Sequence, residues 1–456
     1  MIRDAGLVLA VPAGLAVTGL AVAVANGEGA AAAGFAAAAV VGGAAGGGLM
    51  VRRDGRPDVL AGRRAKAHPT LALAWLFAAA LAAVPFWFAG ALGGASPSVA
   101  AHGDPLNALF ESMSGLTSTG LSVASDSSEL PRSIQWWRSV LQWVGALGVL
   151  YVALALADEP DDGSEKDRLE PEMDVDESGG VRGIRPVWAL YGAFTAATAV
   201  AFWAAGMPPW AAVNHAMTAM ATGGFAITGD SLASYGRAVH AVAAVALVLG
   251  ALSFGLHLAV FVRGRLGAAV RDGQTRLLGA LLVGGLAALA LATRGGDVPL
   301  ADAAFQWTSA LTTAGFTTQD VAEYGPFALA ALIAAMFVGG ASGSTAGGLK
   351  LDRARALLRW AAGRRTPLAR PALRQAGRLA VALGAGTAVL VAFAGVPPLD
   401  ALFEATSALG TVGLSVGVSS ADLAAPGRLA LVALMWVGRL EVVAVVALFL
   451  RHQPSR

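Results

Sequence analysis

Long apolar stretches alternate with short polar segments along almost the whole chain of 456 residues. A transmembrane helix needs about 20 consecutive apolar residues to cross a hydrocarbon core about 30 Å thick. Ten stretches meet this requirement, so the pattern predicts an all-α polytopic membrane protein. The predicted spans are residues 6–26, 29–50, 70–94, 136–157, 186–206, 238–262, 276–294, 326–348, 376–396 and 428–450.

The composition supports this class and excludes several others. Hydrophobic residues make up 56% of the chain and charged residues 14%, compared with about 25% charged residues in soluble domains. The sequence contains no cysteine, which excludes a disulfide framework, a thiolate metal site and a cysteine nucleophile. An enzyme embedded in the membrane would need clustered His, Asp or Glu side chains. The six histidines are scattered, so no catalytic residue is predicted and the chain is not expected to be an enzyme.

Lysine and arginine are concentrated in alternate loops, and an excess of these residues is typical of cytoplasmic loops. The rich loops are residues 51–69, 263–276 and 349–378. The alternate loops contain only Arg132, Arg138, Arg237, Arg294 and Arg428. With ten spans, the rich loops and both termini fall on one side of the membrane. We therefore predict a multi-pass protein of the inner or plasma membrane with both termini in the cytoplasm.

One predicted cytoplasmic loop, residues 158–185, is strongly acidic. From Asp158 to Glu177 it contains eleven acidic residues and two basic ones. One interpretation is a solvated, flexible connector, because runs of like charge repel one another. The other is a docking surface for a soluble partner. The predicted orientation holds in both cases, because acidic residues contribute little to it.

Four segments of the chain align with one another without gaps. They are residues 110–123, 214–227, 305–318 and 403–416. Each segment has a glycine at the same position, namely Gly120, Gly224, Gly315 and Gly413. Each follows a proline, and each precedes a second glycine inside the next apolar stretch. The prolines are Pro105, Pro209, Pro299 and Pro398, and the second glycines are Gly145, Gly250, Gly339 and Gly438.

Each repeat predicts a span, a short helix that begins near the proline, a turn and a second span. The short helix has about 12 residues, too few to cross a bilayer, so it is expected to re-enter the membrane. The fold class that follows has four pseudo-symmetric span–pore helix–span units around a central pore, plus two N-terminal helices. The predicted segments are a helix pair (1–50), a basic loop (51–69), unit 1 (70–157), the acidic loop (158–185), unit 2 (186–263), unit 3 (276–350) and unit 4 (376–450).

The turns after the short helices are rich in small residues, and we call them the four Thr/Gly turns. They are residues 117–120, 221–224, 312–315 and 410–413. Small residues let several backbones converge, and a ring of carbonyl oxygens can replace the hydration shell of a cation. The partly negative C-terminal ends of the short helices would favour the same ion. Glycine and threonine also serve close helix packing, but their repetition in four units favours an ion filter.

Taken together, the four turns, the spans that follow them and residues 339–350 resemble the TrkH/KtrB superfamily of potassium transporters. The resemblance covers about residues 70–450, and the two additional N-terminal spans are similar to the ten-span TrkH branch. It implies that backbone carbonyls around each filter glycine bind K⁺. The corresponding residues here are Ser118, Thr119, Gly120, Thr222, Gly223, Gly224, Thr313, Ala314, Gly315, Thr411, Val412 and Gly413. Relatives that prefer Na⁺ often have serine at the first glycine, so glycine in all four units implies K⁺.

The resemblance also implies a role for Arg439, which matches an arginine just below the filter in the last span. Its charge would form a barrier to K⁺, or it would only tie neighbouring pore loops together through their carbonyls. Residues two apart on a helix do not face each other, so Glu441 is a poor partner for Arg439. Two alternatives remain open for Glu441, pairing with another helix or a position near the cytoplasmic vestibule. The third unit's last span contains a glycine-rich segment, interpreted as an intramembrane gate loop or as a packed kink. Its residues are Gly339, Gly340, Ser342, Gly343, Ser344, Thr345, Gly347 and Gly348.

The function that the resemblance implies is K⁺-selective uptake through a gated, pseudo-tetrameric pore, with K⁺ as the transported ion. The chain has no Walker-type loop, so no organic cofactor is expected in it. The family implies a homodimer in membrane lipid and a cytoplasmic nucleotide-binding regulatory subunit of the TrkA/KtrA type, with no nucleic acid. A cation-coupled secondary transporter (K⁺/H⁺ or K⁺/Na⁺ symport) is the alternative. Inverted repeats are disfavoured because every repeat enters the membrane from the same side.

Overall fold

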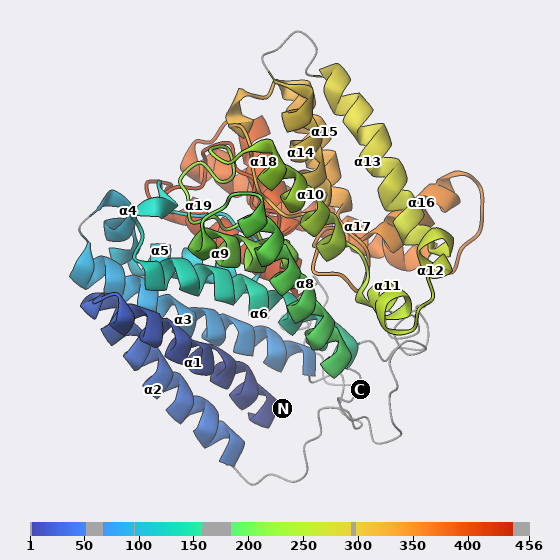
Figure 1. The fold of residues 1–456 in the computed structure, drawn as a ribbon. Coiled ribbons are helices and arrows are strands. Elements are labelled where there is room, and N and C mark those ends of the chain that lie inside the picture. The colour runs from blue at the N-terminus through green and yellow to red at the C-terminus, as the bar shows by residue number, and fades with distance from the viewer. Residues whose placement is uncertain (1, 52–66, 95, 157–183, 293–297, 441–456) are drawn as a thin grey trace, which may run out of the picture.

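The structure is a computed structural model that describes residues 2–51, 67–94, 96–156, 184–292 and 298–440. These residues form helices joined by turns and loops, with no strands among them (Figure 1). The long helices are α1 Ile2–Ala25, α2 Gly29–Val51, α3 Ala67–Gly93, α6 Arg132–Leu156, α8 Ile184–Ala204, α10 Arg237–Ala251, α13 Gly273–Ala292, α15 Pro326–Val338, α16 Leu351–Ala361, α17 Ala369–Ala394 and α19 Ala425–Arg439. The short elements are α4 Pro97–Ala100, η2 Ala101–Gly103, η3 Ser127–Glu129, α11 Phe254–His257, η5 Leu258–Val262, α12 Gly267–Arg271 and η6 Val321–Glu323.

Four further helices match the predicted short helices of the repeats, and we call them the pore helices. They are α5 Pro105–Leu116, α9 Pro209–Met220, α14 Leu300–Leu311 and α18 Pro398–Leu409. Each has 12 residues. Three begin at the predicted proline, and in α14 Pro299 is the N-cap residue. Proline suits this position because its missing N–H would have no partner in the first turn of a helix. The prediction of four short helices is confirmed.

Six described helices are long and apolar enough to cross a membrane, namely α1, α2, α3, α8, α13 and α17. In Figure 1, α1, α2 and α3 lie side by side, so the two N-terminal helices pack against the first helix of the predicted unit 1. The predicted span 136–157 lies on α6, which begins at Arg132. The predicted span 428–450 lies on α19 up to Leu440, and the rest of it, including Glu441, is outside the described residues.

Two predicted spans are broken in the structure, and the prediction of a continuous helix is wrong for the first of them, residues 238–262. In the predicted span 238–262, α10 ends at Ala251, and the chain bends by 103° before it continues as α11 and η5. In the predicted span 326–348, α15 ends at Val338. Beyond it, the backbone turns at Gly339, which has a φ of 72°. The sequence predicted the glycine-rich interruption of the second of these spans, but not the break in the first.

The two breaks pair with each other, which explains how a membrane protein tolerates them. Ala341 N donates a hydrogen bond to Ala251 O over 2.9 Å, and Phe254 N donates to Gly343 O over 2.8 Å. Backbone groups without water must find partners inside the protein. Each break therefore supplies the partners that the other needs, and α10 and α15 are held together where they end.

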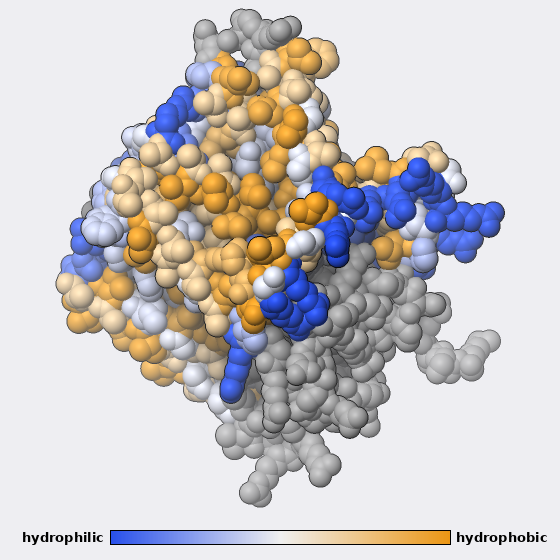
Figure 2. All heavy atoms as spheres, turned by 45° about the vertical axis from the view of Figure 1, so that its right-hand side comes forward, coloured by the Kyte–Doolittle hydropathy of each residue, from blue (hydrophilic) through white to orange (hydrophobic). Residues whose placement is uncertain are grey.

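The described surface agrees with a membrane protein. Figure 2 shows a largely hydrophobic face, with strongly hydrophilic side chains at its right-hand, lower and upper left edges. The predicted basic loops 263–276 and 349–378 contain the helices α12 and α16, respectively. Most of the loop 51–69, and the acidic loop up to residue 183, lie outside the described residues.

Candidate ion-selective site

All four pore helices end in the same hydrogen-bonded turn. In the first unit, Ser118 N donates to Gly115 O over 3.0 Å, and Thr119 N donates to Ser114 O over 2.9 Å. The matching second bonds run from Gly223 N to Thr218 O (2.9 Å), from Ala314 N to Ser309 O (2.9 Å) and from Val412 N to Ser407 O (2.8 Å). This pattern is the Schellman motif, which satisfies the last carbonyl groups of a helix. The four Thr/Gly turns therefore share one backbone geometry.

One residue in each turn has a left-handed backbone. The φ angles are 51° at Ser118, 48° at Thr222, 54° at Thr313 and 49° at Thr411. Glycine usually occupies this position of the motif, and another residue there is strained by about 1–3 kcal/mol. The same strained conformation recurs in all four units. Strain of this kind gathers at functional sites.

The glycines that follow bring the four turns into a closed ring of contacts. Gly120 has a φ of 98°, and an ideal Cβ on it would lie 2.1 Å from Gly223 O in the next unit. The remaining contacts join Gly224 to Ala314 O at 2.3 Å, Gly315 to Val412 O at 2.0 Å, and Gly413 back to Thr119 O at 2.2 Å. A side chain would strike the neighbouring carbonyl at each position. All the residues predicted for the filter therefore lie together in this ring.

The second set of repeated glycines lets the following helices approach the ends of the pore helices. An ideal Cβ on Gly145 would lie 2.2 Å from Leu116 O, and one on Gly438 would lie 2.0 Å from Leu409 O. In the second unit, the corresponding distance from Gly250 is 3.0 Å, to Met220 O. These carbonyls belong to the last residues of α5, α18 and α9. Backbone therefore packs directly against backbone beside the Thr/Gly turns.

The glycine-rich residues 339–348, which we call the 339–348 segment, lie against three of the four turns. Gly347 N donates to Thr313 Oγ1 over 2.7 Å, and Thr222 Oγ1 donates to Thr345 Oγ1 over 3.3 Å. An ideal Cβ on Gly347 would lie 2.1 Å from Gly410 O of the fourth unit. The segment is thus in direct contact with the ring.

Arg439 ties the 339–348 segment to two helices. It is the last residue of α19 and is 5% exposed. One guanidinium nitrogen donates to Thr345 O over 3.0 Å, and the other donates to Gly145 O of α6 over 3.3 Å. The sequence left open whether this residue is a charge barrier or a tie between loops. The contacts match the tie, and they also place a positive charge next to the ring.

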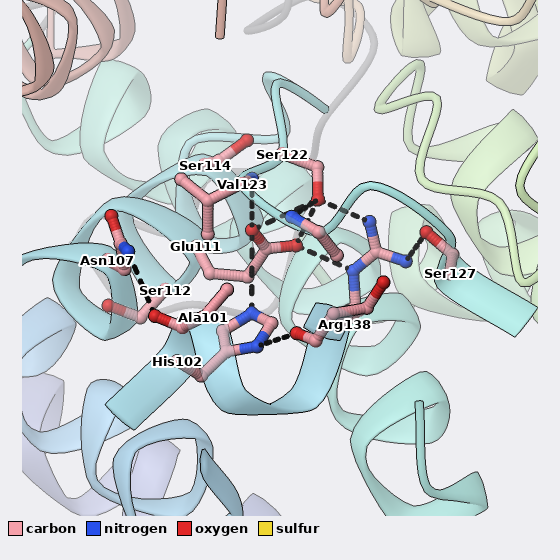
Figure 3. Close-up of polar contacts among 12 residues, drawn as sticks. Ala101, His102, Asn107, Glu111, Ser112, Ser114, Ser122, Val123, Ser127 and Arg138 are labelled. Carbon is pink, nitrogen blue, oxygen red and sulfur yellow. Dashed lines mark hydrogen bonds and ion pairs between the residues drawn. The ribbon is translucent and has the colours of Figure 1, made fainter. Parts of the chain in front are cut away.

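A buried ion pair lies behind the first turn (Figure 3). Arg138 Nε donates to Glu111 Oε1 over 2.8 Å, and neither side chain is more than 3% exposed. Val123 N, three residues beyond the filter glycine, donates to Glu111 Oε2 over 3.0 Å. His102 Nε2 lies 3.8 Å from the same oxygen. The pair therefore joins α5, α6 and the loop that follows the first turn.

The helix α6 also holds the second turn. Arg138 donates to Ala226 O over 2.7 Å, and its guanidinium carbon lies 4.0 Å from the centre of the Phe225 ring. One turn further along, Gln142 Nε2 donates to Gly223 O over 2.5 Å, and Phe225 N donates to Gln142 Oε1 over 3.2 Å. Two polar side chains of α6 thus fix the backbone on both sides of Gly224.

These contacts have no charged counterpart in the other units. Counted from the repeated glycines, the matching positions are Ala243 and Leu247, Leu332 and Met336, and Leu431 and Met435. Glu404 occupies the place of Glu111 in the fourth unit. It accepts from Ser415 Oγ over 2.8 Å and from Ser419 N over 3.0 Å. The polar side-chain contacts that α6 makes to the second turn are therefore not repeated at the matching positions of the other units.

Two other arginines tie neighbouring units together outside the ring. Arg237 of α10 makes two hydrogen bonds to Asp302 of α14, at 2.6 and 2.8 Å. Arg428 of α19 donates to Asp104, which precedes α5, over 2.6 Å. Partial burial raises the pKa of Asp104, but the hydrogen bonds from Arg428 and Leu106 N and the charge of Arg428 outweigh it and hold the pKa below its usual value. With Arg138, these residues account for three of the five arginines in the loops predicted to face outward.

The sequence prediction missed Glu111, Arg138 and Gln142. A signal was present for Arg138, because a charged residue inside a predicted span is normally paired or faces a watery cavity. Within the described ranges, no cluster of three His, Asp or Glu side chains could hold a metal ion. The carbonyl oxygens of the ring are therefore the candidate cation ligands. The class of protein defined by this arrangement is an all-helical polytopic membrane protein with four short helices whose C-terminal turns are in contact.

Comparisons with known proteins identify the family. The family model of TrkH, described as a cation transport protein, matches residues 66–271, 296–366 and 388–456. This match covers well over half of the chain, so the chain belongs to the TrkH family of cation transport proteins. Members of this family are membrane transporters rather than enzymes. The resemblance seen in the sequence is confirmed.

Individual relatives cover most of the chain. The Trk system potassium uptake protein TrkH of Halomonas elongata is 30% identical over 81% of this chain and 84% of its own length. An uncharacterized cation transporter of Methanocaldococcus jannaschii is 28% identical over 84% and 82%, respectively. The crystal structure of the potassium transporter TrkH from Vibrio parahaemolyticus has a TM-score of 0.81 and 26% identity. The match covers 100% of this chain and 98% of the chain in that crystal structure. The fold predicted from the sequence is therefore that of a solved transporter.

Proposed function

We propose that the chain mediates K⁺-selective uptake across the cell membrane through a pore formed where the four Thr/Gly turns meet. The observation that carries this proposal is the closed ring, in which each filter glycine lies against a carbonyl of the next unit. Carbonyl oxygens that converge on one axis can replace the hydration shell of an ion. The relatives named for potassium uptake support K⁺ as the transported ion.

The proposal extends to the gate and to partners. The 339–348 segment is the proposed gate loop, because it contacts three turns and breaks a helix where a span would otherwise continue. A cytoplasmic regulatory subunit is proposed because several relatives are named as parts of a Trk system. A homodimer in a lipid bilayer, with the basic loops and both termini in the cytoplasm, completes the proposal.

Ion uptake into proteoliposomes tests this function. Purified protein is reconstituted, and uptake of K⁺, Rb⁺ or Na⁺ as the transported ion is measured with and without a pH gradient. We expect K⁺ and Rb⁺ uptake well above Na⁺ uptake, with no need for a second gradient. Equal uptake of K⁺ and Na⁺ would reject the filter. Uptake that requires a proton or Na⁺ gradient would instead support the cation-coupled symporter.

Replacing Gly120 with serine is expected to lower the K⁺/Na⁺ uptake ratio by about tenfold, which corresponds to roughly 1.4 kcal/mol of discrimination. The added Cβ would meet Gly223 O, so the carbonyl ring must shift. Gly206→Ser is the matched control, because Gly206 also has a positive φ, of 99°, but nothing lies within 4 Å of its ideal Cβ. An unchanged ratio in folded Gly120→Ser would show that this position does not select ions.

Deleting residues 342–347 is expected to raise basal K⁺ flux severalfold without changing ion preference. A gate obstructs flow next to the filter but does not select the ion. A milder variant is Thr345→Val, which removes the hydroxyl 2.9 Å from Gly250 O. Thr345→Ser keeps the hydroxyl and serves as its control. Flux that stays low in the deletion variant, and still depends on a partner, would contradict the gate.

A further inference from the structure

A cavity of about 390 Å³ lies next to the 339–348 segment, at the end of the molecule where α11, α12 and α16 come together (Figure 1). Its polar lining consists of Ser253, Asp272, Gln274, Ser342, Asp352, Arg355, Arg359 and Thr366. Sites for small ligands have volumes of about 300–1,000 Å³. The cavity is therefore large enough for a small organic molecule rather than for a single ion.

The two acidic side chains of the cavity are already used as acceptors. Asp272 Oδ2 accepts from Thr275 N over 2.6 Å and from Thr275 Oγ1 over 2.7 Å. Asp352 Oδ1 accepts from Ser342 Oγ over 2.5 Å. The first of these contacts caps α13, and the second holds the 339–348 segment.

The two arginines of the cavity, in contrast, have N–H groups that can donate hydrogen bonds to a ligand. Arg355 and Arg359 lie one turn apart on the same face of α16. Neither side chain forms a hydrogen bond or an ion pair with another of the residues that the structure describes. Guanidinium groups bind phosphate through paired N–H donors. Asp272 Oδ1 can accept from a hydroxyl group on the same ligand.

We propose that this cavity binds a phosphate ester that carries hydroxyl groups, either a soluble one or the headgroup of an anionic lipid. Its lining is linked to the 339–348 segment through Ser342, whose N–H donates to Gln274 Oε1 over 2.8 Å. Ser342 Oγ donates to Asp352. A ligand in the cavity therefore stabilises the 339–348 segment in the position that these hydrogen bonds of Ser342 define. This last step rests on the proposed gate, whereas the binding site itself does not.

Binding is tested on the full chain with two probes of the same chemistry. Glycerol 3-phosphate is titrated into detergent-solubilised protein, and thermal unfolding is followed. Separately, the protein is reconstituted in phosphatidylcholine vesicles with or without phosphatidylglycerol. We expect stabilisation by at least one probe, and a loss of affinity of about tenfold in Arg355→Gln and in Arg359→Gln. Stabilisation by glycerol 3-phosphate identifies a soluble ligand, and stabilisation only by phosphatidylglycerol identifies a lipid headgroup.

The controls are Arg364→Gln and Arg365→Gln, which remove exposed charges from the same cytoplasmic segment but do not line the cavity. Equal losses in the controls, or no effect of either probe on the wild type, would overturn the site. Uptake measured with and without the effective probe tests the link to the gate. If the probe binds and flux does not change, the link is wrong although the site stands.

Discussion

Arg138→Gln is expected to lower the free energy of unfolding by about 3–5 kcal/mol and to weaken ion discrimination. The first effect follows because removing one partner of a buried ion pair leaves the other charge without compensation. Glu111 is 0% exposed and would be that charge. The second effect follows because Arg138 also holds Ala226 O beside the second turn. Thermal unfolding in detergent and the K⁺/Na⁺ uptake ratio are the two measurements.

Arg237→Gln is the matched control for this prediction. Arg237 also pairs with a carboxylate through two hydrogen bonds, but its side chain is 59% exposed, and exposed pairs contribute about 0–1 kcal/mol. The double variant Glu111→Gln/Arg138→Gln is expected to recover part of the lost stability, because no unpaired charge remains. If Arg138→Gln is as stable as Arg237→Gln, the buried pair does not support the ring.

The large-scale plan of the molecule could be predicted because it depends on local signals. Four prolines mark where the pore helices begin, and 12 residues are too few to span a membrane. The repeated glycines identified the ring because only glycine tolerates both the backbone angle and the nearby carbonyl. These features are contained in short stretches of sequence, so a single sequence is enough to recognise them.

Other features depend on contacts between distant segments and could not be predicted. The break after Ala251 has no proline or glycine run to signal it. It exists because the 339–348 segment supplies partners for its backbone groups. Likewise, the choice between a charge barrier and a tie for Arg439 requires the position of Thr345 O. The asymmetry introduced by Gln142 is visible only when α6 is placed against the second turn.

Arg439→Gln is expected to increase K⁺ flux severalfold with ion preference preserved. Two physical reasons lead to the same result. On the proposed function, the fixed charge next to the ring would repel a departing cation, and the guanidinium holds the 339–348 segment, the proposed gate, through Thr345 O. A mid-membrane arginine costs at least about 2.5–3.5 kcal/mol, so its retention in a buried position indicates a specific role. Uptake into proteoliposomes and thermal unfolding are measured together.

Arg439→Lys separates the two reasons, because lysine keeps the charge but cannot donate to Thr345 O and Gly145 O in the planar geometry of a guanidinium. Faster flux in both variants shows that releasing the 339–348 segment opens the path. Faster flux only in Arg439→Gln shows that the charge is the barrier. Arg428→Gln controls for loss of a charge at the other end of α19, where the pairing is with Asp104. Slower flux with a lower unfolding temperature in both Arg439 variants would contradict both roles, the charge barrier and the hold on the 339–348 segment. It would show that Arg439 only stabilises the packing of α19 against α6.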